Sequence, residues 1–193
     1  GKFVLMQVSD AQDLQHVRRT MTRMLDKAYD TVKPDLVFFT GDNILGNHLL
    51  DARFGSRKIG EGFSDTYISM EKALSHILEP LHKRNIPFAM IYGNHDDMNC
   101  ITKDEQAVLY RNYLNCMDMN RDNSNIDCDT YYINITDDSG NIIFRLYMLD
   151  SAWQDKDEKK ECHCEIKKQT VDWLVEENKE CLVNGIPALL FTH

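Results

Sequence analysis

Three short apolar runs, each ending in a polar turn, constrain the fold of this chain more than any other feature of its sequence. They span residues 3–8, 36–40 and 88–92. Runs of this length are typical of strands buried on both faces of a parallel sheet. Between them, residues 14–32 and 67–84 carry apolar side chains at three- and four-residue spacing, which predicts two amphipathic helices.

The order of these segments predicts the fold class. Alternating strands and helices indicate right-handed βαβ crossovers and therefore an α/β fold. Residues 130–135 and 142–149 flank a turn-rich cluster, which predicts a pair of antiparallel strands. A helix over residues 166–180 and a buried strand over 187–192 follow. Because the chain shows no internal repeat or linker, we expect residues 1–193 to form a single domain.

Charge and hydropathy limit the partners and the compartment. A formal net charge of −9 argues against a broad basic face for nucleic acid. No apolar run reaches the roughly 20 residues of a membrane helix, and no signal-peptide pattern is present. We therefore expect a cytoplasmic protein with reduced thiols, unless an export signal has been removed. The Asn134-Ile135-Thr136 sequon points toward the secretory alternative.

Polar side chains gather at the ends of four predicted strands, the three N-terminal ones and the last. They are Asp10 and Gln12, Asp42 and Asn43, then Asn94, His95 and Asp96, and finally His193. The carboxyl ends of parallel strands meet at one edge of a sheet, so these groups are expected to converge on one crevice. Carboxylates, amide oxygens and imidazoles bind divalent ions such as Mn²⁺, Mg²⁺, Fe²⁺ or Zn²⁺, and one carboxylate can bridge two ions. Asp42 is the candidate for the bridge.

These polar tips resemble the motifs of the calcineurin-like metallophosphoesterases. In chain order they read Asp10-x-Gln12, Gly41-Asp42-Asn43, Gly93-Asn94-His95-Asp96 and Thr192-His193. The Gly-Asn-His-Asp element is the most specific of the four. The resemblance implies an αββα sandwich and the hydrolysis of a small phosphate monoester or diester with the help of two divalent metal ions.

The same resemblance implies a role for each metal ligand. Asp10 and Gln12 serve the first ion, Asp42 bridges, and Asn94 and His193 serve the second ion. One departure concerns Gln12, because the family most often has histidine there. An amide oxygen in place of an imidazole nitrogen favours Mn²⁺ or Mg²⁺ over Zn²⁺ or Fe²⁺, so we expect manganese first.

Four further residues receive roles from the resemblance or from their position. His95 is implied to stabilise the phosphoryl group or to protonate the leaving oxygen, with Asp96 orienting its ring. Asn43 and His48 are candidates for contact with substrate. His16, His76 and His82 fall in predicted helices and are not expected to be ligands.

A second departure from the family pattern is that no Gly-His-x-His element occurs before the chain stops at His193. We therefore expect a sandwich that is truncated before its last strands, and a fragment that can itself be inactive. Asp10 and Asp42 also have a structural interpretation as helix caps or turn residues. A non-catalytic, metal-stabilised scaffold of the same fold is accordingly the alternative to the hydrolase.

Overall fold

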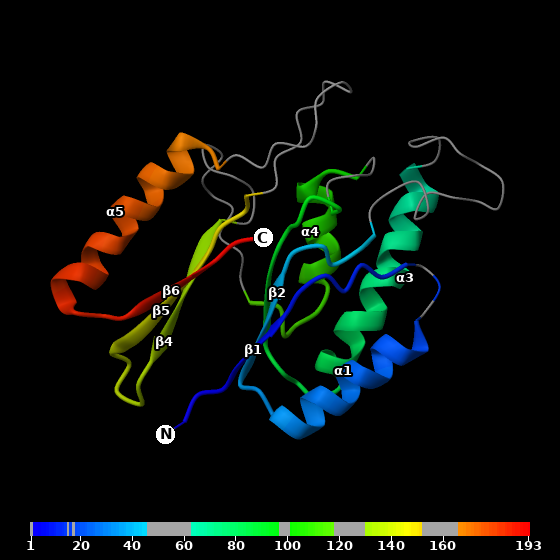
Figure 1. Ribbon diagram of the computed structural model, residues 1–193, viewed down its shortest axis with the longest axis horizontal. Coiled ribbons are helices and arrows are strands. Elements are labelled where there is room, and N and C mark those ends of the chain that lie inside the picture. Colours follow the sequence, from blue (N-terminus) through cyan, green and yellow to red (C-terminus); the bar gives the residue numbers. More distant parts are fainter. Residues whose placement is uncertain are drawn as a thin grey trace.

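The computed structural model describes residues 2–14, 16, 18–45, 63–96, 101–117, 130–151 and 166–193. Within these residues the chain forms two three-stranded sheets, with helices on the outer side of each (Figure 1). The expected α/β sandwich is therefore confirmed. No helix of the described part is both long and apolar enough to span a bilayer.

The first sheet contains the three N-terminal strands in the order β1, β2, β3. They are β1 (Leu5–Val8), β2 (Leu36–Thr40) and β3 (Phe88–Ile91). All pairs are parallel, with Leu5 opposite Leu36 and Val37 opposite Phe88. Every residue of β2 and β3 is buried, as their continuous apolar sequence predicts.

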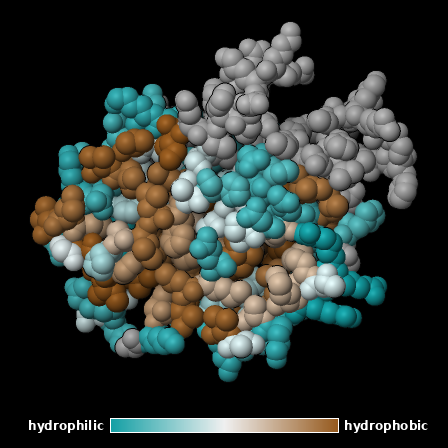
Figure 2. Space-filling view, viewed as in Figure 1, coloured by the Kyte–Doolittle hydropathy of each residue, from teal (hydrophilic) through white to brown (hydrophobic). Residues whose placement is uncertain are grey.

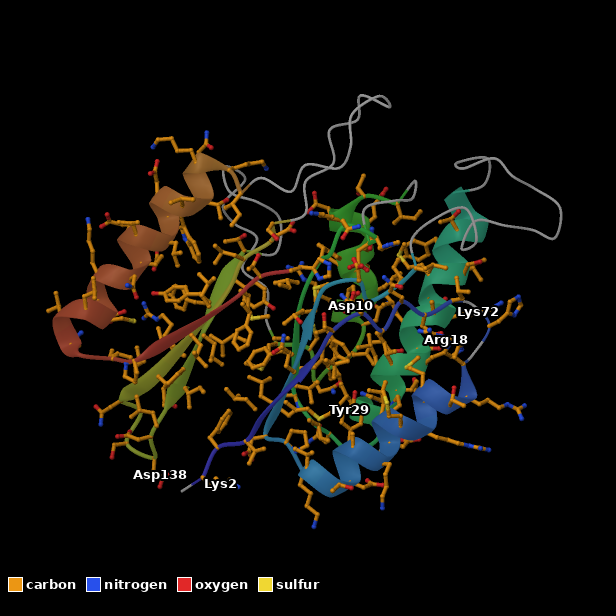
Figure 3. All side chains as sticks on the ribbon, viewed as in Figure 1. Lys2, Asp10, Arg18, Tyr29, Lys72 and Asp138 are labelled. Atoms are coloured by element: carbon orange, nitrogen blue, oxygen red, sulfur yellow. The ribbon has the colours of Figure 1, made fainter. Side chains whose placement is uncertain are left out.

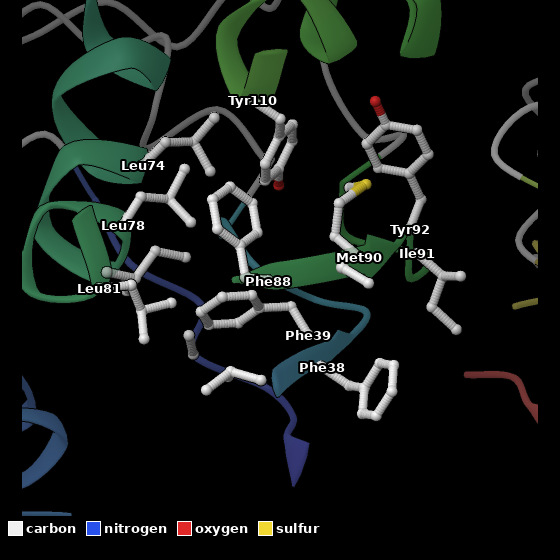
Figure 4. Close-up of a cluster of buried hydrophobic side chains, with 14 of the residues drawn as sticks. Phe38, Phe39, Leu74, Leu78, Leu81, Phe88, Met90, Ile91, Tyr92 and Tyr110 are labelled. Atoms are coloured by element: carbon white, nitrogen blue, oxygen red, sulfur yellow. The ribbon is translucent and has the colours of Figure 1, made fainter. Parts of the chain in front are cut away.

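Helices α1 (Arg19–Val32) and α3 (Phe63–His82) cover the outer face of this sheet. Leucines of α3 pack onto the aromatic rings of β2 and β3, and Phe39 and Phe88 meet edge to face with centroids 6.0 Å apart (Figure 4). Each such buried side chain contributes about 1.5–3 kcal/mol to folding. The main core therefore lies between the first sheet and its helices.

The second sheet contains β4 (Tyr131–Thr136), β5 (Ile142–Met148) and β6 (Ala188–Phe191). The β4–β5 pair is the expected antiparallel hairpin, whereas β6 adds to β5 in parallel. Helix α5 (Lys168–Asn184) covers the outer face and ends where Gly185 takes a left-handed conformation, with φ 65°. The β6 edge carries no further strand among the described residues.

Arg145 of β5 anchors α5 to the second sheet. Its guanidinium donates to the Asn134 amide oxygen at 2.7 Å and to the Glu177 carbonyl at 2.8 Å. It also pairs with Glu180 at 2.5 Å and lies 4.2 Å from the ring centre of Tyr132. A buried cation is stable here because its donors all face acceptors or an aromatic ring.

Contacts that join the two sheets include a stacked pair of rings and a tyrosine hydroxyl. Phe38 stacks on Phe191 with ring centroids 4.7 Å apart. The Tyr131 hydroxyl donates to the Met90 carbonyl at 2.7 Å and accepts from the Met90 N–H at 3.0 Å. This hydroxyl satisfies the backbone N–H and carbonyl of Met90 on the outer edge of β3, beyond the isolated bridge that Cys116 makes to Phe88.

Two helices differ from the sequence prediction. Helix α1 begins at Arg19 rather than at residue 14, because Asp13 pairs with Ile44 beyond the end of β2 and the helix starts only after this bridge. Helix α4 (Lys103–Arg111) lies in a stretch for which we predicted no element. It begins at a capping box, in which the Thr102 hydroxyl accepts from the Glu105 N–H and the Glu105 carboxylate accepts from the Thr102 N–H.

Candidate metal centre

The turns after β1 and β2 run side by side and carry the first candidate ligands. The Asp10 N–H donates to the Gly41 carbonyl at 3.2 Å, and the Gln12 N–H donates to the Asp42 carbonyl at 2.8 Å. Asp10, Gln12 and Asp42 all have positive φ, at 56°, 40° and 51°. Non-glycine residues hold this conformation only where the surroundings enforce it, and such strain is common at functional sites.

Two glycines let the ligand turns approach one another closely. A Cβ atom at Gly93 would lie 2.2 Å from the Asp42 carboxylate oxygen Oδ1. A Cβ atom at Gly41 would lie 2.6 Å from the His193 ring, and Gly41 itself has φ +93°. The glycines of the Gly-Asp and Gly-Asn motifs are thus required by the close packing of Asp42 and His193.

His193 reaches this edge from the second sheet, at the end of β6. Its Nδ1 donates to the Thr40 carbonyl at 2.9 Å, and the Ser151 hydroxyl donates to the His193 carbonyl at 2.8 Å. Because a carbonyl only accepts, Nδ1 carries the proton and Nε2 keeps a free lone pair. That Nε2 lies 3.4 Å from Asp42 Oδ1.

Asp10, Asp42 and His193 together form a candidate metal-binding group. One ligand atom from each lies within 4.8 Å of the others, and no other group of three His, Cys, Asp or Glu ligands occurs in the described part of the chain. Two carboxylates this close repel each other unless a cation lies between them. The donor set therefore fits a divalent ion, and the expected convergence of segments far apart in sequence is observed.

The remaining two candidate ligands lie at the same edge. Gln12 is half-buried, and its amide nitrogen donates to Asp42 Oδ2 at 3.0 Å, which leaves its amide oxygen available. Asn94 is half-buried in the turn after β3, between Gly93 and His95. The backbone N–H of His95 donates to Asp42 Oδ1 at 2.9 Å, so this turn is fixed directly to the candidate bridge.

The His95 ring is held by a backbone carbonyl. Its Nδ1 lies 3.0 Å from the Leu45 carbonyl, so Nδ1 is the donor and Nε2 faces the site, 3.9 Å from Asp42 Oδ2. We had expected Asp96 to orient this ring. The Asp96 carboxylate instead accepts backbone N–H groups of Asn43, Ile44 and Gly93 at 2.7–3.2 Å.

Asp96 thereby links the turn that carries Asp42 and Asn43 to the turn that begins at Gly93. The side chain is fully buried, and burial raises the pKa of its carboxyl to about 7, while the three backbone N–H groups act to lower it. Its described contacts tie two loops together, so the geometry makes it a positioning residue rather than a group at the reacting atoms.

Asn43 also differs from the sequence expectation. We expected it to contact substrate, but its side chain is buried and its amide nitrogen donates to the Ile91 carbonyl at 3.0 Å. With 1% of its surface exposed, the side chain faces the interior and not the surface from which a substrate would approach. His48 lies outside the described residues.

Sequence reasoning missed several groups that build the site. The Thr40 and Leu45 carbonyls fix the two histidine rings, and Ser151 holds the end of β6. Backbone carbonyls leave no signature in a sequence. The glycines before Asp42 and Asn94 belong to the sequence motifs. Their lack of a side chain is the one sequence signal that these turns approach one another closely.

Comparisons with known proteins agree with this geometry. The family model described as calcineurin-like phosphoesterase matches residues 5–193. Relatives include Phosphatase DCR2 of Saccharomyces cerevisiae, which is 32% identical over 41% of this chain, and Probable inactive purple acid phosphatase 28 of Arabidopsis thaliana, 24% identical over 89%. The uncharacterized protein C1020.05 of Schizosaccharomyces pombe is 32% identical over 46%. The matched regions are 11%, 44% and 14% of these relatives' lengths, so the chain spans less than half of each.

Proposed function

The chain belongs to the calcineurin-like phosphoesterase family, and from this premise we propose that it hydrolyses a small phosphate monoester or diester at the edge where β1, β2 and β3 end and the candidate ligands meet. The observation that carries the proposal is the meeting of Asp10, Asp42 and His193 ligand atoms within 4.8 Å. These residues come from both sheets, and packing alone gives no reason to gather two carboxylates and an imidazole lone pair at one point.

We assign the ligands as the motif order implies. Asp10 and Gln12 hold one divalent ion, Asn94 and His193 hold another, and Asp42 is shared. When bound, such ions supply a water that is acidic enough to act as a nucleophile near neutral pH, and they offset the charge of the phosphate oxygens. Gln12 provides an oxygen donor rather than an imidazole, which supports Mn²⁺ as the preferred ion.

His95 is the proposed catalytic residue. Its Nδ1–H is anchored on Leu45, so the ring presents Nε2 toward Asp42 and the crevice. In protonated form this Nε2 can donate to the phosphoryl group or to the departing oxygen. Asp96 acts one step away, by fixing the backbone of the Asn43 and Gly93 turns. The cytoplasmic location and the small phosphorylated substrate stay predictions.

The test is hydrolysis of p-nitrophenyl phosphate and bis(p-nitrophenyl) phosphate with added Mn²⁺. Asp42→Asn and His95→Ala are each expected to lower kcat/KM by at least about 100-fold, because each removes a group that acts on the transition state. Asp138→Asn and His16→Ala are the matched controls, since both side chains are exposed and lie outside the candidate centre. The preferred compound distinguishes a monoesterase from a diesterase.

The alternative is the metal-stabilised scaffold, and the name of the Arabidopsis relative, which includes the word inactive, keeps it in view. Mn²⁺ binding without turnover of either compound would favour the scaffold. Turnover that survives both active-site substitutions would contradict the proposed centre.

A further inference from the structure

Asp13 is a buried carboxylate immediately beyond the ligand turn, and the proposed chemistry does not use it. Its side chain has no exposed surface. Oδ1 lies 3.2 Å from Arg18 Nε and Oδ2 lies 3.0 Å from His76 Nδ1. Enclosing an ionised carboxylate costs several kcal/mol unless it is paired, so these two partners account for its stability there.

The Asp13 cluster holds the ligand turn through contacts that are separate from its backbone hydrogen bonds to Gly41 and Asp42. On the centre's side, Asp10 and Gln12 are held by backbone bonds to Gly41 and Asp42. On the helix side, Arg18 bonds both the Asp13 carboxylate and the Ala11 carbonyl, which lies between the two ligands in sequence. In Figure 3 Arg18 lies beside helix α3, on the stretch of chain that leads from Asp10 to α1.

Backbone hydrogen bonds also connect Asp13 to the second ligand turn, which carries Asp42. The Asp13 N–H donates to the Asn43 carbonyl at 3.3 Å, and the Leu45 N–H donates to the Asp13 carbonyl at 3.0 Å. Leu45 is the residue whose carbonyl holds His95. Asp13 therefore connects three parts of the molecule, which are the Asp10–Gln12 turn, the residues that follow Asp42, and helix α3.

We propose that Asp13, with Arg18 and His76, is a positioning residue of the metal centre: it holds Asp10 and Gln12 in the left-handed conformation that aims them at the ion. The inference rests on the proposed function, because it assumes that these side chains bind metal. Left-handed backbone at Gln12, with φ 40°, is unfavourable by roughly 1–2 kcal/mol and persists only when neighbours enforce it. Outer partners that orient ligands typically contribute 10- to 100-fold to metal affinity.

A purely structural role makes a different prediction. If Asp13 only tied α3 to the sheet, its loss would lower the stability of the metal-free protein and leave metal affinity unchanged. Asp26 provides the comparison, since from α1 it pairs with Arg84, in the turn that follows α3, at 2.8 Å without touching the ligand turn. Asp26→Asn thus removes an ion pair that holds α1 to the end of α3 and leaves the ligand turn unchanged.

The experiment is a Mn²⁺ titration of the whole chain, with free Mn²⁺ followed by electron paramagnetic resonance and unfolding measured in parallel with a chelator present. Asp13→Asn is expected to raise the Mn²⁺ dissociation constant about 10- to 100-fold, and Asp26→Asn is expected to leave it within about twofold of wild type. Wild-type affinity in a folded Asp13→Asn protein would overturn the inference.

His76→Gln is the second variant, which tests the same positioning role if Asp13→Asn does not fold. Glutamine retains a donor for Asp13 but not the ring geometry, so about 10-fold weaker binding is expected, and unchanged binding would overturn the inference. A wild-type chain that binds no Mn²⁺ would contradict the proposed metal centre itself and this inference with it. Normal binding by both variants would contradict the positioning role alone.

Discussion

In the sheet of β1, β2 and β3 the central strand is covered on both faces, whereas in the sheet of β4, β5 and β6 the last strand lies open. Leu36 of β2 is 3% exposed, and Leu190 of β6 is 46% exposed. Hydrophobic residues gather on the surface around β6 and α5 in Figure 2. The first sheet is held by an apolar core, and the second is attached to its helix by Arg145 and by the Trp173 ring, which packs against Tyr132 and Tyr147.

The difference matters because the candidate centre takes ligands from both sheets. Asp10 follows β1, which is paired with β2, and Asp42 follows β2, which is buried. The turns that carry both residues are fixed by backbone hydrogen bonds. His193 follows the exposed strand and is fixed by the Thr40 carbonyl and by Ser151. The first sheet therefore supplies a rigid half of the site, and it also holds the ligand that the second sheet contributes.

Matched leucine substitutions should separate the two sheets most strongly. Leu36→Ala is expected to lower the free energy of unfolding by about 3 kcal/mol, because it leaves a cavity between β1 and the core. Leu190→Ala is expected to cost less than about 1 kcal/mol, since half of that side chain is already in water. Urea denaturation of both variants measures the difference. Equal losses would show that β6 is covered in solution.

Matched glycine substitutions should place the function on the first sheet. Gly93→Ala forces a methyl group against Asp42 and is expected to lower kcat/KM by about 100-fold or more, which is about 2.7 kcal/mol. Gly140→Ala, in the β4–β5 turn, meets no atom within 4 Å, although its φ of +85° gives a stability cost of about 1 kcal/mol. Steady-state kinetics with Mn²⁺ decide. Activity retained in Gly93→Ala would count against Asp42 as a ligand.

Matched arginine substitutions test how each sheet holds its helices. Arg145→Met removes a buried guanidinium that links β4, β5 and α5, and it is expected to cost about 2 kcal/mol. Arg84→Met removes partly exposed pairs with Asp26 and Asp30 over the first sheet, and it is expected to cost under about 1 kcal/mol. Thermal unfolding compares the two. A larger loss in Arg84→Met would reverse the contrast drawn between the sheets.

Much of the first sheet could be predicted from the sequence, because strands buried on both faces leave continuous apolar runs. The runs at 36–40 and 88–92 became β2 and β3. The start of α1 could not be predicted, since the pairing of Asp13 with Ile44 is a long-range contact that overrides local spacing. Helix α4 could have been predicted, because Thr102 and Glu105 form a capping box at the required spacing.

The candidate site was predictable in its ligands and less so in its supports. Asp10, Asp42 and His193 were proposed from strand ends and lie together. The expected roles of Asn43 and Asp96 followed from their neighbours in sequence, and burial gave both residues different contacts. Which face a polar side chain takes after a strand depends on tight turns whose geometry no local pattern specifies.

The hydroxyl oxygen of Tyr131 matters for how a sequence variant at this position should be interpreted. Replacement by phenylalanine preserves the ring and most of its volume, so substitution tables rate it as conservative. Here the loss of that one oxygen would leave both the N–H and the carbonyl of Met90 without this hydrogen-bond partner, at a buried junction of the sheets that water does not reach. Serine or threonine cannot span the same gap. A change that looks mild at this position is therefore a change in how the two sheets are joined.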